Sequence, residues 1–212
     1  MKYGTFVKAP APNPPRWPAF SPEGVAAAAD CLRAGGLIVA PTESSYCLAA
    51  SAALGDALGA ARTLKARAGT GGKALLLLCS SLEQARSIGV FDDRALALGA
   101  LWPAPLTLIV QPIDDALADA LGATGLALRV PACEPARSLA DRVGPYTGTS
   151  ANRAGESPLL DPSLAETLGG AISGVLDAGI LPGGAPSTLV DTRGATLVVL
   201  RSGAFPEGRL RS

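Results

Sequence analysis

The sequence predicts a single α/β domain built around one central, mixed and twisted sheet. Signals for helices and strands alternate from residue 21 to residue 203, a pattern typical of helices packed on a sheet. Apolar residues form 48% of the 212-residue chain and charged residues 17%, which is sufficient for a substantial core. No internal repeat and no long linker marks a second domain. We therefore expect an extended proline-rich arm over residues 1–20 and one domain over residues 21–212.

The elements of this domain are predicted from caps, turns and apolar runs. Five prolines between residues 10 and 18 disfavour a helix in the arm. Ser21 is a suitable N-cap, Pro22 fits a first helical turn, and Gly35 and Gly36 can end that helix. Further helices are expected at residues 56–65, 81–88, 92–102, 113–121, 134–143 and 162–168. Strands are expected at residues 37–40, 74–79, 106–111, 126–130, 146–150, 175–180, 187–191 and 196–200.

Charge and composition exclude some classes of function. The 18 Lys and Arg balance 18 Asp and Glu, whereas a broad nucleic-acid surface usually needs an excess of positive charge. A small anionic ligand is compatible with zero net charge. The chain has no His, so it lacks the commonest general base near neutral pH and the commonest metal ligand. Catalysis must therefore depend on positioning, Lys and Arg, hydroxyls, carboxylates, or a metal carried by the substrate.

The cysteines and the N-terminal sequence indicate a cellular compartment. Cys31, Cys47, Cys79 and Cys133 are widely spaced, with mostly apolar or small neighbours, so we expect reduced thiols in the core and not a metal site. The first residues lead into the prolines and not into the apolar run of a signal peptide. No segment approaches about 18 uninterrupted apolar residues. We expect a cytoplasmic protein that does not enter the membrane.

A basic segment is the clearest candidate for ligand binding. Arg62, Lys65, Arg67 and Lys73 surround a glycine-containing stretch at residues 68–72, and no Asp or Glu occurs from residue 57 to residue 82. A flexible backbone with fixed positive charge on both sides is suited to phosphate. A solvated loop with scattered basic residues is the alternative interpretation.

Other polar stretches lie at predicted strand ends, where open α/β sheets place ligands. Residues 41–48 combine hydroxyls, a carboxylate and a phenol, although a turn would have the same composition. Residues 147–155 offer hydroxyls, an amide and flexible backbone suited to a nucleotide. Arg129 ends an apolar run, so its guanidinium must either pair with a carboxylate or face a cleft.

Taken together and in order, these segments form a specific set of motifs. They are Gly35-Gly36-x-Ile38-x-x-Pro41-Thr42-Glu43-x-x-Tyr46-x-Leu48, Lys65-x-Arg67, Trp102-Pro103-x-Pro105-x-Thr107, Arg129-Val130-Pro131, Thr149-Ser150-Ala151-Asn152-x-x-Gly155, Ser187-Thr188-x-x-Asp191 and Arg201-x-Gly203. Over residues 24–203 the chain resembles the YrdC-like family of threonylcarbamoyl-AMP synthases, in its short, single-domain form. The resemblance implies a twisted, mostly mixed or antiparallel sheet with flanking helices, curved around a basic concave cleft.

The resemblance also implies an activity. Members of the family make threonylcarbamoyl-AMP and pyrophosphate from ATP, L-threonine and bicarbonate, the first step toward the tRNA nucleoside N6-threonylcarbamoyladenosine (t6A37). It implies Mg²⁺ bound through the ATP phosphates, and tRNA or proteins of the t6A pathway as partners. The implied threonine-binding residues are Thr42, Arg129, Thr149 and Ser187. The implied catalytic residues are Lys65 and Arg67, and those at the nucleotide are Tyr46, Lys65, Arg67, Ser150, Ala151, Asn152 and Arg201.

Several positions depart from the family pattern. Cys47 and Ala104 replace glycines, Ser44-Ser45 replace the usual Thr-Val, and the segment after Arg67 lacks a proline. Two alternatives are therefore kept: a paralogue with another carbamoyl acceptor or weak synthase activity, and a non-catalytic protein that binds tRNA or ribosomal RNA. Zero net charge disfavours the RNA-binding alternative.

Overall fold

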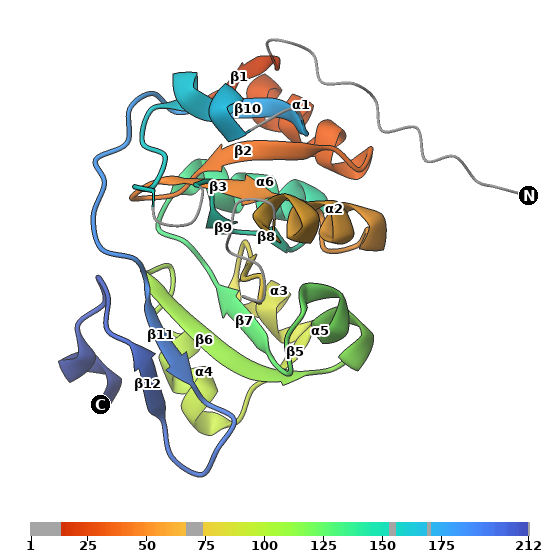
Figure 1. Cartoon of the computed structure of the whole chain (residues 1–212). Coiled ribbons are helices and arrows are strands. Elements are labelled where there is room, and N and C mark those ends of the chain that lie inside the picture. The colour runs from red at the N-terminus through yellow and green to blue at the C-terminus, as the bar shows by residue number, and fades with distance from the viewer. Residues whose placement is uncertain (1–13, 67–73, 153–155, 169–170, 212) are drawn as a thin grey trace, which may run out of the picture.

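The computed structural model describes residues 14–66, 74–152, 156–168 and 171–211. Their strands form two mixed sheets, which lie in the upper and lower halves of Figure 1. The predicted α/β class and mixed pairing are confirmed, but two sheets replace the one central sheet that we expected. The division occurs within the predicted strand at residues 146–150, whose first half pairs with one sheet and whose second half pairs with the other.

The first sheet has the order β1-β10-β2-β3-β9. Its strands are β1 Arg16–Pro18, β10 Ile172–Asp177, β2 Leu37–Pro41, β3 Tyr46–Ala49 and β9 Thr149–Ser150. Strand β1 lies within the predicted proline-rich arm and pairs in parallel with β10 at the edge of the sheet, where proline is tolerated. Strand β3 was not predicted, because hydroxyl-rich sequence directly before it indicated a loop.

The second sheet has the order β12-β11-β6-β7-β4-β8, with β5 also paired to β6. Its strands are β12 Val198–Arg201, β11 Thr188–Asp191, β6 Leu106–Pro112, β7 Leu126–Arg129, β4 Leu77–Leu78, β8 Tyr146–Thr147 and β5 Gly89–Val90. Parallel pairs (β11 with β6, β4 with β7) and antiparallel pairs occur side by side. Strand β4 is shorter than the predicted strand at residues 74–79.

Helices cover both sheets. They are α1 Pro22–Arg33, α2 Gly55–Lys65, α3 Leu82–Arg86, α4 Asp93–Gly99, α5 Asp115–Leu121 and α6 Glu134–Val143, with 3-10 helices η2 Pro162–Leu168 and η3 Glu207–Arg211. In Figure 1, α1 covers the first sheet, whereas α4 and α5 lie beside the second. Among the described residues, no helix has both the length and the apolar character to cross a membrane.

Local sequence explains where the helices begin. The predicted N-cap Ser21 accepts a hydrogen bond from the Gly24 N–H at 2.9 Å, and Ser81 and Asp92 cap α3 and α4 in the same way. A cap of this kind typically stabilises a helix by about 1 kcal/mol. The predicted helix at residues 162–168 is a 3-10 helix.

Two clusters of buried apolar residues join the layers. One packs α1 and α6 against the first sheet, with Leu32, Ile38 and Leu139 fully buried. The other lies between the sheets and packs α2 and α5 against Leu77, Leu106 and other strand residues. Each fully buried leucine contributes roughly 1.5–3 kcal/mol through removal of its surface from water. The core thus fixes the strand ends that carry the polar motifs.

Candidate active site

An ion pair joins the two sheets at the ends of β2 and β7. Thr42 and Ser45 close the turn after β2: the Thr42 hydroxyl donates to the Ser45 carbonyl at 2.7 Å. Within this turn the Glu43 carboxylate accepts a hydrogen bond from Nη2 of Arg129, the last residue of β7. Of the two outcomes predicted for Arg129, the carboxylate partner is therefore the one observed.

Burial acts on the charge of Arg129. Its side chain is 7% exposed, and its Nε also donates to the Ala104 carbonyl at 3.4 Å. Loss of solvent, with a smaller contribution from the nearby charge of Arg201, lowers the pKa of Arg129 to about 10. Arg129 nevertheless remains a cation at neutral pH, so it can still bind a carboxylate.

A second arginine holds a buried pair of hydroxyls. Arg201, at the end of β12, donates from Nη2 to the Ser187 carbonyl at 2.8 Å and to the Ser187 hydroxyl at 3.2 Å. The Ser187 hydroxyl lies 2.7 Å from the hydroxyl of Thr107. We refer to Glu43, Arg129, Arg201, Ser187 and Thr107 as the Arg129 cluster. With two arginines and one glutamate, this cluster carries a net positive charge.

Lys65 organises the loop after β9. Its ammonium group donates to the backbone carbonyls of Ser150 at 2.8 Å and Asn152 at 3.0 Å. The Ser150 hydroxyl in turn donates to the Asn152 side-chain oxygen at 2.6 Å, and the Asn152 amide donates to the Glu156 carbonyl at 2.9 Å. We refer to Lys65, Ser150 and Asn152 as the Lys65 cluster. It brings together three of the predicted nucleotide-binding residues.

The other members of the predicted basic segment are placed differently. Arg62 donates to the carbonyls of Asp119 and Ala120, near the end of α5, where a cation offsets the negative end of the helix dipole. Arg67 and Lys73, with the glycines between them, lie outside the described residues. The phosphate-binding role of this segment stays a prediction.

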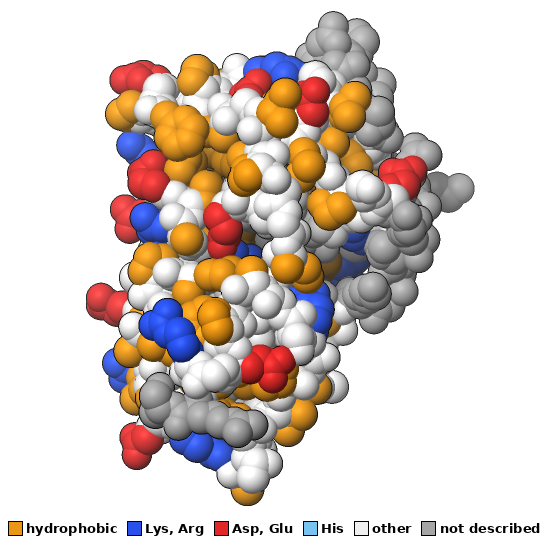
Figure 2. Space-filling view, turned by 90° about the vertical axis from the view of Figure 1, so that its left-hand side faces the viewer, with side chains coloured by type: hydrophobic (Ala, Val, Ile, Leu, Met, Phe, Trp, Pro, Cys, Tyr) orange, Lys and Arg blue, Asp and Glu red, His pale blue; other side chains and the backbone are white. Residues whose placement is uncertain are grey.

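Strand register relates the two clusters. Leu78 of β4 pairs with Arg129 on one side and with Tyr146 on the other. Two residues after β8 begins, the chain crosses at Gly148 to the first sheet, where Ser150 pairs with Cys47. The order β7-β4-β8 therefore leads from Arg129 to the crossing at Gly148, after which the chain continues to Ser150 of the Lys65 cluster. The face of the molecule drawn in Figure 2 shows Lys and Arg side chains set back at mid-height, between its upper and lower halves.

Three predicted site residues are enclosed by the fold to different degrees. Tyr46 is fully buried; its hydroxyl donates to the Gly179 carbonyl at 2.7 Å and accepts from the Ala178 N–H at 2.9 Å. Burial raises the pKa of Tyr46 to about 12. Ala151 is also buried, and its N–H donates to the Tyr46 carbonyl. Thr149 is partly exposed in β9. Tyr46 thus supports the loop through its backbone, while its phenol is bonded elsewhere.

Both glycine replacements are accommodated in the core. Cys47 is 2% exposed and pairs with Ala40 and Ser150 in the first sheet. Ala104 is 6% exposed, and its N–H donates to the Val130 carbonyl at 3.1 Å. The added side-chain atoms therefore lie in packed surroundings.

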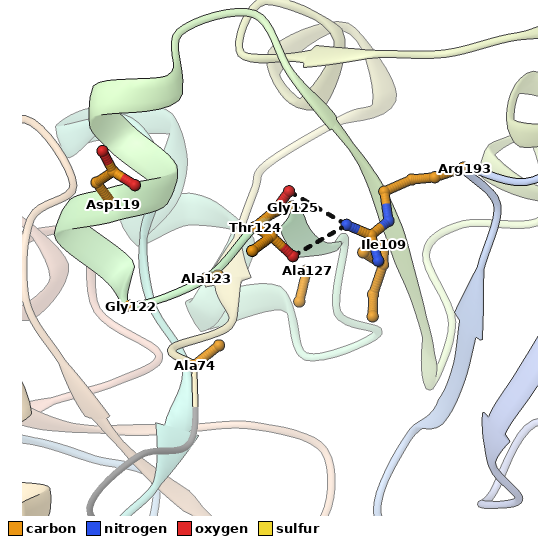
Figure 3. A pocket seen from close by; sticks show the side chains of 9 residues that line it. All are labelled: Ala74, Ile109, Asp119, Gly122, Ala123, Thr124, Gly125, Ala127 and Arg193. Carbon is orange, nitrogen blue, oxygen red and sulfur yellow. Dashed lines mark hydrogen bonds between the residues drawn. The ribbon is translucent and has the colours of Figure 1, made fainter.

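A hollow of about 450 Å³ lies at the other end of β6 and β7, and none of the predicted site residues lines it. Figure 3 shows Arg193 reaching toward Thr124 in this hollow. Arg193 donates to both oxygens of Asp191, at 2.9 and 2.7 Å, and to the Thr124 carbonyl at 3.1 Å. These bonds from Arg193 hold the pKa of Asp191 below its usual range. The guanidinium of Arg193 is thus already paired with a carboxylate, and we assign the hollow no ligand.

A family model and a curated relative each match most of the chain. A family model described as Sua5_yciO_yrdC, "Telomere recombination", matches residues 30–203. The threonylcarbamoyl-AMP synthase of Thiobacillus denitrificans is 34% identical over 175 residues, which cover 81% of this chain and 91% of that protein.

Solved structures agree with this match. Sua5 of Pyrococcus abyssi in complex with L-threonine has a TM-score of 0.82 and 26% identity, covering 93% of this chain. This chain spans only 58% of the length of that Sua5. YciO of Escherichia coli has a TM-score of 0.77 and covers 91% of this chain and 95% of YciO; at 23% identity this likeness shows the fold. The expected resemblance is confirmed: the chain belongs to the Sua5–YciO–YrdC family.

Proposed function

We propose that this chain is an L-threonylcarbamoyladenylate synthase, which forms threonylcarbamoyl-AMP and pyrophosphate from ATP, L-threonine and bicarbonate. The Arg129 cluster carries the proposal, because a net positive charge beside a buried pair of hydroxyls suits a small hydroxy amino acid. The name of the T. denitrificans relative and the L-threonine complex of P. abyssi Sua5 support it.

In this proposal the two clusters bind different substrates. Arg129 takes the threonine carboxylate, and Thr42, Thr149 and Ser187 complete the amino-acid site. The Lys65 cluster takes the nucleotide, together with Tyr46, Ala151 and Arg201. Arg67, outside the described residues, acts with Lys65 on the phosphates.

The chemistry requires alignment more than proton transfer by a side chain. The threonine amine attacks the carbon of bicarbonate and water leaves, which gives a carbamate. A carbamate oxygen then attacks the α-phosphorus of ATP, and pyrophosphate departs with its bonding electrons. Cations placed beside the developing negative charge lower this barrier without titrating, so the absence of His from the sequence is no obstacle.

Magnesium enters this scheme with its substrate. Among the described residues, no group of three or more His, Cys, Asp and Glu is placed to hold a metal ion. We propose that Mg²⁺ binds as the ATP complex, because Mg²⁺ usually bridges phosphates and keeps several waters. The product would serve the t6A pathway, with tRNA or proteins of that pathway as partners in the cytoplasm.

The proposal is tested by pyrophosphate release from ATP, with each component omitted in turn. We expect release that requires both L-threonine and bicarbonate. Replacing threonine with each other amino acid tests the acceptor, and a clear preference for another one would indicate a paralogue. Release that needs neither component, or no release with any amino acid, would contradict a synthase function.

A further inference from the structure

Only one of the two oxygens of the Glu43 carboxylate accepts a hydrogen bond from the described residues. Its Oε1 accepts the hydrogen bond from Arg129. Its Oε2 is buried and has no hydrogen-bond partner among the described residues. A buried charged oxygen without a partner is unfavourable, and neither the ion pair nor the proposed synthase mechanism accounts for it. Oε2 is therefore a vacant acceptor within the Arg129 cluster.

The partner of Glu43 has a spare donor. Arg129 uses Nη2 for Glu43 and Nε for Ala104, while its Nη1 donates to none of the described residues. Arg201 adds a second positive charge that is close enough to lower the pKa of Arg129. A ligand bound here thus meets a donor and an acceptor on two groups already in contact.

A neighbouring donor and acceptor of opposite charge complement an α-amino acid. Its carboxylate and its ammonium group are carried by the same carbon atom, so one molecule can bind both Arg129 and Glu43. We propose that Glu43 accepts a hydrogen bond from the α-ammonium group of the substrate, as a positioning and specificity residue; this inference rests on the proposed function. It orients the substrate nitrogen and selects amino acids over carboxylic acids without a donor group on the α-carbon, which leave Oε2 unpaired.

A competing interpretation predicts the opposite sign. In the competing interpretation, Glu43 only pairs with Arg129 until the substrate carboxylate displaces it. Removing the negative charge of Glu43 should then strengthen substrate binding. If Glu43 binds the ammonium group, the same change should weaken it. A single substitution therefore separates the two interpretations.

The experiment is calorimetric titration of L-threonine and of 3-hydroxybutyrate, which is threonine without its ammonium group, into the purified full chain. The variants are Glu43→Gln, Glu43→Asp, and Glu83→Gln as a control that removes an exposed negative charge in α3. For Glu43→Gln we expect threonine binding to weaken by roughly tenfold to a hundredfold, the contribution of a charge-assisted hydrogen bond. Binding of 3-hydroxybutyrate should stay the same or strengthen, and Glu83→Gln should change neither ligand.

The other outcomes are equally informative. Unchanged or tighter threonine binding in Glu43→Gln, or an equal loss for both ligands, would overturn the role of Glu43 alone. An unaltered protein that binds no amino acid would overturn the threonine site and this role together. If circular dichroism shows Glu43→Gln to be unfolded, Glu43→Asp is the deciding variant. Asp retains the negative charge, but its shorter side chain places the carboxylate differently, so the affinity for threonine should fall below that of the unaltered protein. The affinity for 3-hydroxybutyrate should not change.

Discussion

The ammonium group of Lys65 lies 2.8 Å from the carbonyl oxygen of Ser150 and so joins the end of α2 to β9. A second bond from the same group reaches the Asn152 carbonyl. Lys65 is 8% exposed, so these bonds form largely away from solvent. The lysine that we assign to the phosphates therefore also shapes the backbone of the loop around them.

Replacing Lys65 should accordingly affect both stability and activity. Lys65→Met keeps most of the apolar stem but removes the donors to Ser150 and Asn152. We expect the free energy of unfolding to fall by about 1–3 kcal/mol, because two part-buried hydrogen bonds lose their charged donor, and we expect pyrophosphate release to be lost. Urea unfolding and the pyrophosphate assay measure the two effects.

Arg62→Met is the matched control for that change. Arg62 is exposed, and its bonds to Asp119 and Ala120 are long, at 3.3 and 3.4 Å. We expect a stability change below about 1 kcal/mol with pyrophosphate release retained. Equal effects of the two substitutions would contradict a special role for Lys65.

Gly148 should tolerate no side chain, because it lies where the chain crosses between sheets. A Cβ atom there would approach Cγ of Leu78 to 2.5 Å, and Leu78 is fully buried between Arg129 and Tyr146. We expect Gly148→Ala to lower the free energy of unfolding by about 1–3 kcal/mol through overpacking. In contrast, Gly59→Ala in α2 meets no atom within 4 Å and should stabilise the protein by up to about 1 kcal/mol. Thermal unfolding of the two variants checks both signs.

The hydroxyl pair of Thr107 and Ser187 should show the asymmetry of buried hydrogen bonds. Both residues are at most 4% exposed, and their hydroxyls lie 2.7 Å apart. Ser187→Ala leaves the Thr107 hydroxyl without this partner, at an expected loss of about 1–3 kcal/mol. Combining it with Thr107→Val should recover part of the loss. A double variant less stable than the sum of the single changes would contradict a coupled pair.

Tyr46 should make stability dependent on alkaline pH. Below pH 10 the phenol is protonated in both folded and unfolded chains. Because its pKa is raised from 10.0 to about 12 in the fold, only the unfolded chain loses the proton between these values, and the stability contributed by Tyr46 is lost as pH rises. Tyr46→Phe should be less stable at neutral pH, since it loses the bonds to Ala178 and Gly179, and should decline less steeply from pH 10 to 12. Denaturant titrations across this range measure the slope, and parallel slopes would contradict the assignment.

The sequence predicted the elements of this fold better than their pairing. Ser21 caps its helix as expected, and the helices predicted from residues 81 and 92 begin directly after Ser81 and Asp92, because helix starts depend on residues that are close in sequence. The division into two sheets depends on Gly148, where nothing local marks a change of partner. Strand β3 was missed because its four buried residues follow a polar turn.

The candidate site shows the same limit. Arg129 was predicted to need a carboxylate or a cleft, but its partner Glu43 is 86 residues away, and no local pattern identifies it. The acceptors of Lys65 are backbone carbonyls, which have no signature in the side-chain sequence. Motif order selected the candidate residues, whereas their mutual contacts required the fold.

The crossing at Gly148 has a mechanical consequence. Tyr146 and Thr147 belong to the second sheet, Thr149 and Ser150 to the first, and Glu43 and Arg129 link the same two sheets across their ends. A molecule bound by Arg129 and by the loop after β9 would therefore contact both sheets and link them. Separation of the two sheets would require that molecule to dissociate first. The substrate-bound chain should therefore unfold in a single transition.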